Sequence, residues 1–190
     1  MALQLFDEEE FLNIDYSATK PAIGEYDTCI FKACDFTNAD ISGTAFIDCV
    51  FEQCLFSNTN LIDTMFQSCH FNGSKLLGTD FSKCRAFLLS FNFSDCQLDL
   101  SSFHRLELKK ILFRNCSLKE VDFEETVLTG ALFENCDLEG AIFVKTNLEN
   151  VDFTTANNYS FDPEMNSIRK AHFSLQGLPG LLQKYDIIIN

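Results

Sequence analysis

Nine cysteines and three histidines are the first residues to consider for chemistry in this chain of 190 residues. Thiolates and imidazoles could bind zinc, but zinc sites usually combine close ligand pairs two to four residues apart. The cysteine spacings are not those of such a site, because most cysteines recur at intervals of five residues or its multiples. The histidines are His70, His104 and His172, which stand alone in the sequence, and the first two are expected to face solvent. We therefore predict no catalytic residue, no metal ligand and no cofactor.

Two close pairs of acids could also do chemistry: Glu124 with Glu125, and Asp137 with Glu139. Paired carboxylates serve as general acid and base, or as ligands of a cation. Both roles usually need a cleft, and the sequence implies none. We interpret these acids as a solvated face, so the chain is not expected to be an enzyme.

The elements that carry these residues follow a five-residue repeat. A large apolar residue recurs at every fifth position from Phe31 to Phe81, and again from Phe93 to Phe153. A small or medium residue stands two positions earlier, and all nine cysteines occupy this slot. Residues two apart in a strand point to the same side, so both positions face a core. The fifth residue is often Gly, Asn or Asp, which favour turns, so each pentad predicts one short side of a coil.

A second period of twenty residues indicates how many sides a coil has. It separates Cys29, Cys49 and Cys69, and again Cys96, Cys116 and Cys136. Four pentads per coil predict a four-sided coil in which like residues stack. Burial of each ring or Leu should contribute about 1.5–3 kcal/mol to the stability of the fold. Inward cysteines of adjacent coils would lie about 4.8 Å apart with side chains poorly aimed for a disulfide. We expect reduced, buried thiols in a cytoplasmic protein.

This pattern resembles the pentapeptide-repeat family, whose unit is a small residue, a polar residue, Phe or Leu, and two mostly polar residues. The resemblance implies an all-β fold, a right-handed quadrilateral β-helix, and the handedness comes from the resemblance alone. We predict an N-terminal cap at 1–28, the β-helix at 29–155 with a register break near 85–92, and a C-terminal capping and dimerisation module at 156–190.

The cap and the break allow more detailed expectations. A short helix is expected near Asp7–Leu12. About two extra residues enter near Arg85–Asn92, either as a bulged corner that returns its rings to the core or as a protruding contact loop. If they are looped out, one side of the coil carries Asp35, Asp99, Glu120, Asp137 and Glu139, and the adjacent side carries Asp40, Asp63, Asp80, Asp122, Glu124 and Glu125.

The tail after Phe153 leaves the repeat. Helical spacing of its leucines, with Ser174 as a possible N-cap, predicts a helix that Pro179 would delay, and residues 187–189 read as strand-like. From Asp162 to Ile189 the tail resembles the C-terminal module of bacterial proteins that protect DNA gyrase: plasmid quinolone-resistance, mycobacterial fluoroquinolone-resistance and microcin B17 immunity proteins. The resemblance implies a homodimer joined by Phe173, Leu175, Leu178, Leu181, Leu182, Tyr185, Ile187, Ile188 and Ile189.

The net charge of −14 is concentrated near the end of the repeat. Residues 119–152 carry nine acids and two bases: the acids are Glu120, Asp122, Glu124, Glu125, Glu134, Asp137, Glu139, Glu149 and Asp152. Over less than two coils this gives about one charge per 1.2 Å, against one per ~1.7 Å in duplex DNA. Such a surface should attract a basic partner and should not bind nucleic acid directly.

No run of about 18 apolar residues occurs, so no membrane partner is expected.

Two functions of different classes remain open. The first, implied by the resemblance, is a non-enzymatic DNA mimic that binds a type II topoisomerase, DNA gyrase or topoisomerase IV, modulates it, and protects it from quinolones or a gyrase-poisoning toxin. The alternative is a scaffold or regulatory protein that binds a non-topoisomerase partner through its exposed sides.

Overall fold

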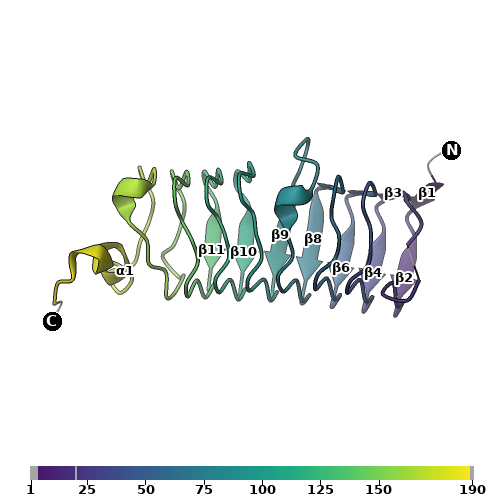
Figure 1. Ribbon diagram of the computed structural model, residues 1–190, viewed down its shortest axis with the longest axis horizontal. Helices are drawn as coiled ribbons and strands as arrows, with labels where there is room; N and C mark the ends of the chain where they lie inside the picture. The colour runs from purple at the N-terminus through teal and green to yellow at the C-terminus, as the bar shows by residue number, and fades with distance from the viewer. Residues whose placement is uncertain (1–3, 20, 189–190) are drawn as a thin grey trace.

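The computed structural model describes residues 4–19 and 21–188, which form a rod of stacked parallel coils (Figure 1). Its strands are β1 Gln4–Asp7, β2 Glu10–Leu12, β3 Gly24–Asp27, β4 Ile30–Lys32, β5 Ala45–Ile47, β6 Val50–Glu52, β7 Met65–Gln67, β8 Cys69–Asn72, β9 Phe91–Ser94, β10 Leu112–Arg114 and β11 Leu132–Glu134. One α-helix, α1 Pro179–Leu182, and 3-10 turns at Phe81–Lys83, Pro163–Met165 and Gln183–Tyr185 complete the elements. The predicted all-β solenoid is confirmed.

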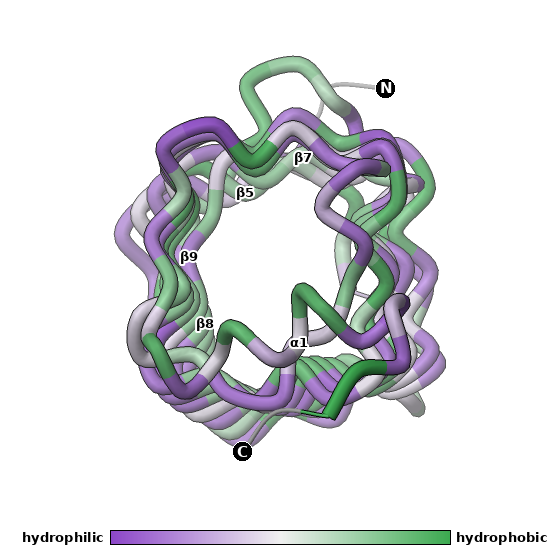
Figure 2. Tube along the Cα trace, turned by 90° about the vertical axis from the view of Figure 1, so that its left-hand side faces the viewer, coloured by the Kyte–Doolittle hydropathy of each residue, from purple (hydrophilic) through white to green (hydrophobic). Residues whose placement is uncertain are grey.

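Each coil has four sides, as the end-on view shows (Figure 2). The first side carries the parallel sheet β1-β3-β5-β7, and the second side carries β2-β4-β6-β8-β9-β10-β11. The third and fourth sides are held by single parallel bridges between residues twenty apart, such as Ser117 with Asp137 and Asp122 with Ile142. Corner residues such as Asn38 (φ 57°) adopt left-handed backbone angles, which Asn, Asp and Gly tolerate best.

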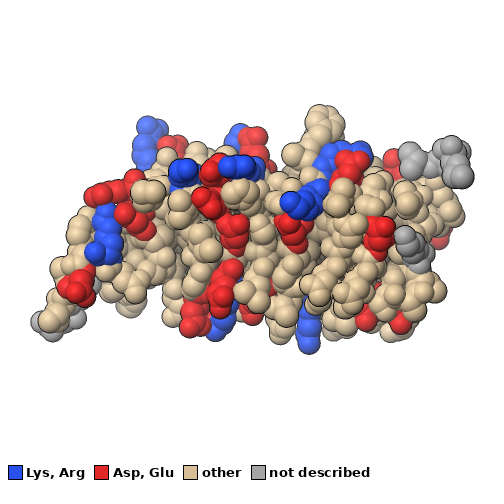
Figure 3. Space-filling model, in the orientation of Figure 1, with Lys and Arg blue, Asp and Glu red and all other residues tan. Residues whose placement is uncertain are grey.

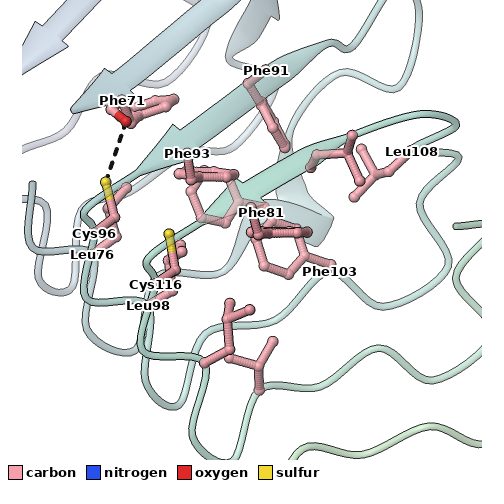
Figure 4. Close-up of a cluster of buried hydrophobic side chains, with 14 of the residues drawn as sticks. Phe71, Leu76, Phe81, Phe91, Phe93, Cys96, Leu98, Phe103, Leu108 and Cys116 are labelled. Carbon is pink, nitrogen blue, oxygen red and sulfur yellow. Dashed lines mark hydrogen bonds between the residues drawn. The ribbon is translucent and has the colours of Figure 1, made fainter. Parts of the chain in front are cut away.

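A continuous stack of phenylalanine rings runs along the inside of the second side. Neighbouring rings are nearly parallel, with centroids 4.7–5.5 Å apart and interplanar angles of at most 19°. The stack consists of Phe11, Phe31, Phe51, Phe71, Phe93, Phe113, Phe133, Phe153 and Phe173. Rings of the other sides meet this stack edge to face, as Phe81 of the fourth side meets Phe93 (Figure 4). Both geometries are favourable for aromatic pairs and leave no room for water.

The small-residue slot is occupied by hydrogen-bond donors as well as by small side chains. The Cys54 thiol donates to the carbonyl of Phe31 on the preceding coil at 3.3 Å, and the Cys96 thiol donates to Phe71 at 3.3 Å (Figure 4). The Thr59 hydroxyl uses the same geometry at 2.8 Å. All nine cysteines are buried and free, as predicted.

The insert shifts the pairing offset from twenty to twenty-two residues, so Phe71 pairs with Phe93. Residues 85–88 of the first side are exposed and Leu89 is only half-buried, and Phe91 fills the space from the small-residue slot. Its ring lies 5.2 Å from both Phe81 and Phe93, and the residue is only 3% exposed. Phe87, in contrast, is 71% exposed on a loop that projects from the rod (Figures 1 and 2). The insert therefore combines the two predicted arrangements, a ring returned to the core and a protruding loop.

The solenoid begins earlier than the sequence analysis predicts. The prediction of a helix near Asp7–Leu12 is wrong, because β1 and β2 occupy this segment and pair with β3 and β4 twenty residues later. Phe6 and Phe11 keep the apolar register and pack against the core. Apolar periodicity outweighs the run of acids that follows Phe6, since those acids remain exposed.

The C-terminal segment also departs from its prediction. Asp152 still pairs with His172, so the coil continues past Phe153. The helix is limited to Pro179–Leu182, with Pro at its start, where a missing N–H costs nothing. Ser174 accepts a hydrogen bond from Gly177 N instead of capping the helix.

The prediction of a strand-like run at residues 187–189 is wrong for the two residues that the structure describes. Ile187 and Ile188 form no strand, because the chain turns through a left-handed Asp186 (φ 49°) and leaves the coil; Ile189 lies outside the described residues. Helix α1 crosses the last coil (Figure 2), where Phe161 N donates to Gly180 O at 3.2 Å. A side chain at Gly180 would collide with the Tyr159 carbonyl, 2.0 Å from the added Cβ.

The insert gives a matched test of core packing. Phe91→Ala should lower the free energy of unfolding by about 3–5 kcal/mol, because it removes a buried ring at a site without another inward residue on the first side. Phe87→Ala should change it by no more than about 0.5 kcal/mol, because Phe87 is exposed. Urea denaturation measures both values, and equal effects would contradict this description of the insert.

Buried thiols should make the fold sensitive to alkali. Burial raises the pKa of Cys49 from 9.0 to about 12. An unfolded thiol ionises near its ordinary pKa, so this contribution to stability is complete below pH 9 and is lost as the pH rises toward 12. At pH 10 the loss amounts to about 1.4 kcal/mol for one thiol. Between pH 8 and pH 10, the free energy of unfolding should fall by about 1.4 kcal/mol less in Cys49→Ala than in the unaltered chain. An identical fall in the two proteins would refute this role of the thiol.

Candidate partner-binding surface

The nine predicted acids lie on all four sides of the coil, because residues 119–152 wrap around the rod more than once. Asp137 and Glu139 are on the third side, Asp122, Glu124 and Glu125 follow on the fourth, and Glu120 lies at the corner between them. Glu149 is on the first side, and Glu134 and Asp152 are on the second. These positions follow from the cross-coil pairs of Ser117 with Asp137, Ser102 with Asp122, Asn147 with Ser167, and Leu132 with Asp152.

The predicted sharing of sides across the insert is confirmed. Lys75 pairs with Gln97 on the third side, and Asp80 pairs with Ser102 on the fourth, both at the offset of twenty-two residues. The acids before and after the insert therefore continue along the same two sides. The third and fourth sides together form one acidic ridge, which we define by Glu120, Asp122, Glu124, Asp137 and Glu139.

Basic residues of the neighbouring coil compensate part of this charge. Arg105 pairs with Glu125 at 2.8 Å, and Arg114 pairs with Glu134 at 2.8 Å, each twenty residues apart. Lys119 reaches both Asp137 and Glu139, at 3.1 and 2.8 Å. Red and blue side chains accordingly lie next to one another along the rod (Figure 3). The charge density estimated from the sequence is too high, because it counts residues that occupy different sides and neglects these pairs.

The guanidinium of Arg105 changes the ionisation of its partner. Its hydrogen bonds hold the pKa of Glu125 below the ordinary value, with a smaller contribution from the Lys145 charge. Lys119 shows the reverse effect, since its hydrogen bonds to Glu139 and Asp137 raise its pKa. These groups therefore stay ionised at neutral pH, and the exposed pairs are open to competition from salt or from a partner's own charges.

Four of the nine acids have no basic side chain within salt-bridge distance among the described residues: Glu120, Glu124, Glu149 and Asp152. Glu120 and Glu124 belong to the acidic ridge, whereas Glu149 and Asp152 lie on the opposite sides. Asp152 accepts hydrogen bonds from the backbone and hydroxyl of Thr154. Glu120 and Glu139 of the ridge are exposed, whereas Glu149 and Asp152 are half-buried, so the most accessible negative charge of this segment is on the ridge.

Sequence reasoning missed the cross-coil ion pairs, although the signal was present. The twenty-residue period that relates the cysteines also relates Arg105 to Glu125, Arg114 to Glu134 and Lys119 to Glu139. Each pair is an acid one coil after a base, which outward side chains of adjacent coils bring into contact.

The predicted dimerisation residues divide into two groups. Leu181 is buried against the last coil, and Phe173 and Leu182 are half-buried. Leu175 and Ile188 are 81% and 89% exposed, and Leu178, Tyr185 and Ile187 are also exposed. The first group caps the solenoid, while the second leaves apolar surface at the end of the rod.

A cavity of about 590 Å³ lies beside the insert and away from the ridge. Its lining includes His70, Leu89, Phe91 and Glu107. Glu107 is the one acid among the described residues of this lining, so the cavity does not bring two acids together. The Glu107 carboxylate is paired with Lys109. Among the described residues, no helix has both the length and the apolar character needed to cross a membrane.

Comparison with known proteins finds a family model of the repeat that matches part of the chain. Residues 64–143 match the family model described as a pentapeptide repeat region, and residues 1–76 match that of the SV2A/B/C luminal domain. No curated protein matches the chain in sequence. The predicted recognition of a pentapeptide repeat is confirmed.

Several solved structures are similar to this chain, and HetL, whose TM-score is above 0.5, shows the same fold. HetL, a pentapeptide-repeat protein involved in heterocyst differentiation regulation from the cyanobacterium Nostoc sp. strain PCC 7120, matches with a TM-score of 0.57 at 14% identity, over 91% of this chain and 87% of HetL. Trypsin-treated QnrB1, a plasmid-mediated fluoroquinolone resistance protein, matches with a TM-score of 0.47 at 18% identity, over 98% of this chain and all of QnrB1. Rfr23 from the cyanobacterium Cyanothece 51142 matches with a TM-score of 0.26 at 19% identity, over 56% of this chain and 88% of Rfr23.

Proposed function

Because the chain is a pentapeptide-repeat solenoid, we propose that it acts without catalysis, as a DNA mimic that binds a type II topoisomerase. The observation that carries this proposal is the acidic ridge: five carboxylates on two adjacent sides, contributed by two successive coils. Short coils stacked on a packed aromatic core hold these groups in fixed positions. A rigid array of acids suits the basic DNA-binding surface of DNA gyrase or topoisomerase IV.

The ion pairs of the ridge define how such binding would work. Lys119 lies between Asp137 and Glu139, so a partner's Lys or Arg must compete with it for these oxygens. Glu120 and Glu124 need no such exchange, since neither has a basic partner among the described residues. They should make the strongest contacts, and the interaction should weaken steeply with added salt.

The exposed end of the tail supports a second element of the proposal. Leu175 and Ile188 leave apolar side chains in solvent at the C-terminal end. Together with the resemblance of the tail to the gyrase-protecting proteins, this favours a homodimer of two rods joined end to end. Such a dimer would modulate the topoisomerase and protect it when a quinolone or a toxin traps it on DNA.

Charge reversal on matched sites tests the ridge. Glu120→Lys should weaken binding to purified DNA gyrase about tenfold, because it places a like charge against a basic surface. Glu149→Lys makes the same change of charge on the first side and should stay within about twofold of the unaltered chain. Surface plasmon resonance at several salt concentrations measures both effects. Equal losses, or no binding by the unaltered chain, would reject the proposed ridge.

Analytical ultracentrifugation tests the dimer. The unaltered chain should sediment as a dimer at micromolar concentration, and Leu175→Asp with Ile188→Asp should convert it to a monomer, because the contact would bury two charges. Leu5→Asp alters an exposed leucine at the opposite end and should leave the dimer intact. A monomeric unaltered chain would exclude this mode of assembly.

A specific observation favours the alternative function, a scaffold with a non-topoisomerase partner. Phe87 and Leu88 are exposed on the insert, and such apolar side chains often anchor a protein contact. Phe87→Ser should abolish the capture of such a partner, while Glu120→Lys should leave it unchanged. The reverse pattern, with gyrase as the captured protein, would favour the acidic ridge.

A further inference from the structure

Three potential metal ligands converge on the fourth side of the coil. His104 comes from one coil, and Asp122 and Glu124 come from the next, with one ligand atom of each within 4.8 Å of the others. His104 and Glu124 are twenty residues apart, so they occupy equivalent outward positions on adjacent coils. His104 stands alone in the sequence, so the sequence predicts no metal ligand there.

The imidazole of His104 is in an unusual environment for a surface histidine. Its Nδ1 atom is buried and has no hydrogen-bond partner in the structure, although 31% of the side chain is exposed. The closest carboxylate oxygen, Oδ2 of Asp122, is 3.9 Å away, which is too far for a hydrogen bond. Buried polar atoms are usually satisfied by protein groups, water or an ion, so this nitrogen is open to a ligand.

We propose that His104, Asp122 and Glu124 bind a divalent transition-metal ion, with Zn²⁺ as the best fit. One imidazole and two carboxylates suit Zn²⁺, whereas Ca²⁺ and Mg²⁺ prefer oxygen ligands alone. Tetrahedral Zn²⁺ with bonds of about 2.0–2.2 Å keeps its ligand atoms about 3.4 Å apart. The separation of 3.9 Å, and the limit of 4.8 Å for the group, would have to shrink by about 0.5 to 1.4 Å. Rotation of these partly exposed side chains provides such a movement.

The surroundings already orient one of the ligands. Asp122 Oδ1 accepts a hydrogen bond from Glu124 N at 2.8 Å, and Oδ2 accepts one from Ser102 Oγ at 3.3 Å. Hydrogen bonds of this kind hold a metal ligand in place and tune its affinity. The nearby cations Arg105 and Lys145 both pair with Glu125, which offsets their repulsion of a metal ion.

A bound ion would connect two coils, since its ligands come from both. It should raise the thermal stability of the chain by mass action, because the unfolded chain separates His104 from Glu124. Asp122 and Glu124 also belong to the acidic ridge, so a bound ion would lower the negative charge there. The binding tests of the ridge therefore use the metal-free chain, and the Zn²⁺ test uses the chain without a partner.

Titration of the untagged, full-length protein with ZnCl₂ tests the site. Isothermal calorimetry should show one ion bound per chain, and His104→Ala and Glu124→Gln should each weaken binding about tenfold or more. His70→Ala removes a histidine from the second side and should bind Zn²⁺ as the unaltered chain does. No binding by the unaltered chain, or equal binding by His104→Ala, would overturn the proposal.

Substitution with Co²⁺ distinguishes this site from the nine cysteines. Visible d–d bands without a thiolate charge-transfer band in the near ultraviolet are expected, because the thiols are buried in the core. A thiolate band would place the metal on cysteine and overturn the assignment. The d–d bands should be lost in His104→Ala and retained in His70→Ala.

Discussion

The stack of phenylalanine rings on the second side is the constraint on which the rest of the structure depends. Each coil must return a ring to the same position, within 5.5 Å of the ring before it. This requirement is met by coils of twenty residues, and by one of twenty-two at the insert, and it places outward side chains in rows. It also explains the insert, which restores the stack at Phe93 and fills the space it creates with Phe91.

Much of this architecture could be predicted because the five-residue period is repeated many times in the sequence. The cysteine slot, the four sides and the two extra residues near Arg85–Asn92 all follow from spacing. The start of the solenoid did not, because acids after Phe6 and the proline at position 21 obscure the register, although only the inward positions must be apolar. The tail depends on contacts with the last coil, such as Gly180 against Tyr159, which no local pattern reveals. The donor role of the slot, as in Thr59, also becomes visible only when the preceding coil is in place.

The surface shows how strongly the coil controls the meaning of charge. A count along the chain suggests one dense acidic segment, whereas the coil distributes it over four sides and places Arg105, Arg114 and Lys119 beside acids of the next coil. The same twenty-residue relation brings His104 to Asp122 and Glu124. Residues that are isolated in the sequence thus form pairs and clusters, and function must be sought in rows across coils.

Carboxyl footprinting of the chain in complex with DNA gyrase tests the central claim most directly. Carbodiimide coupling of an amine labels accessible carboxylates, and mass spectrometry locates each label. The proposed function predicts that gyrase protects Glu120, Glu124 and Glu139 on the third and fourth sides, while Glu149 and Asp152 react as they do in the free chain. Protection of Glu149 and Asp152 with unchanged labelling of the ridge would contradict it.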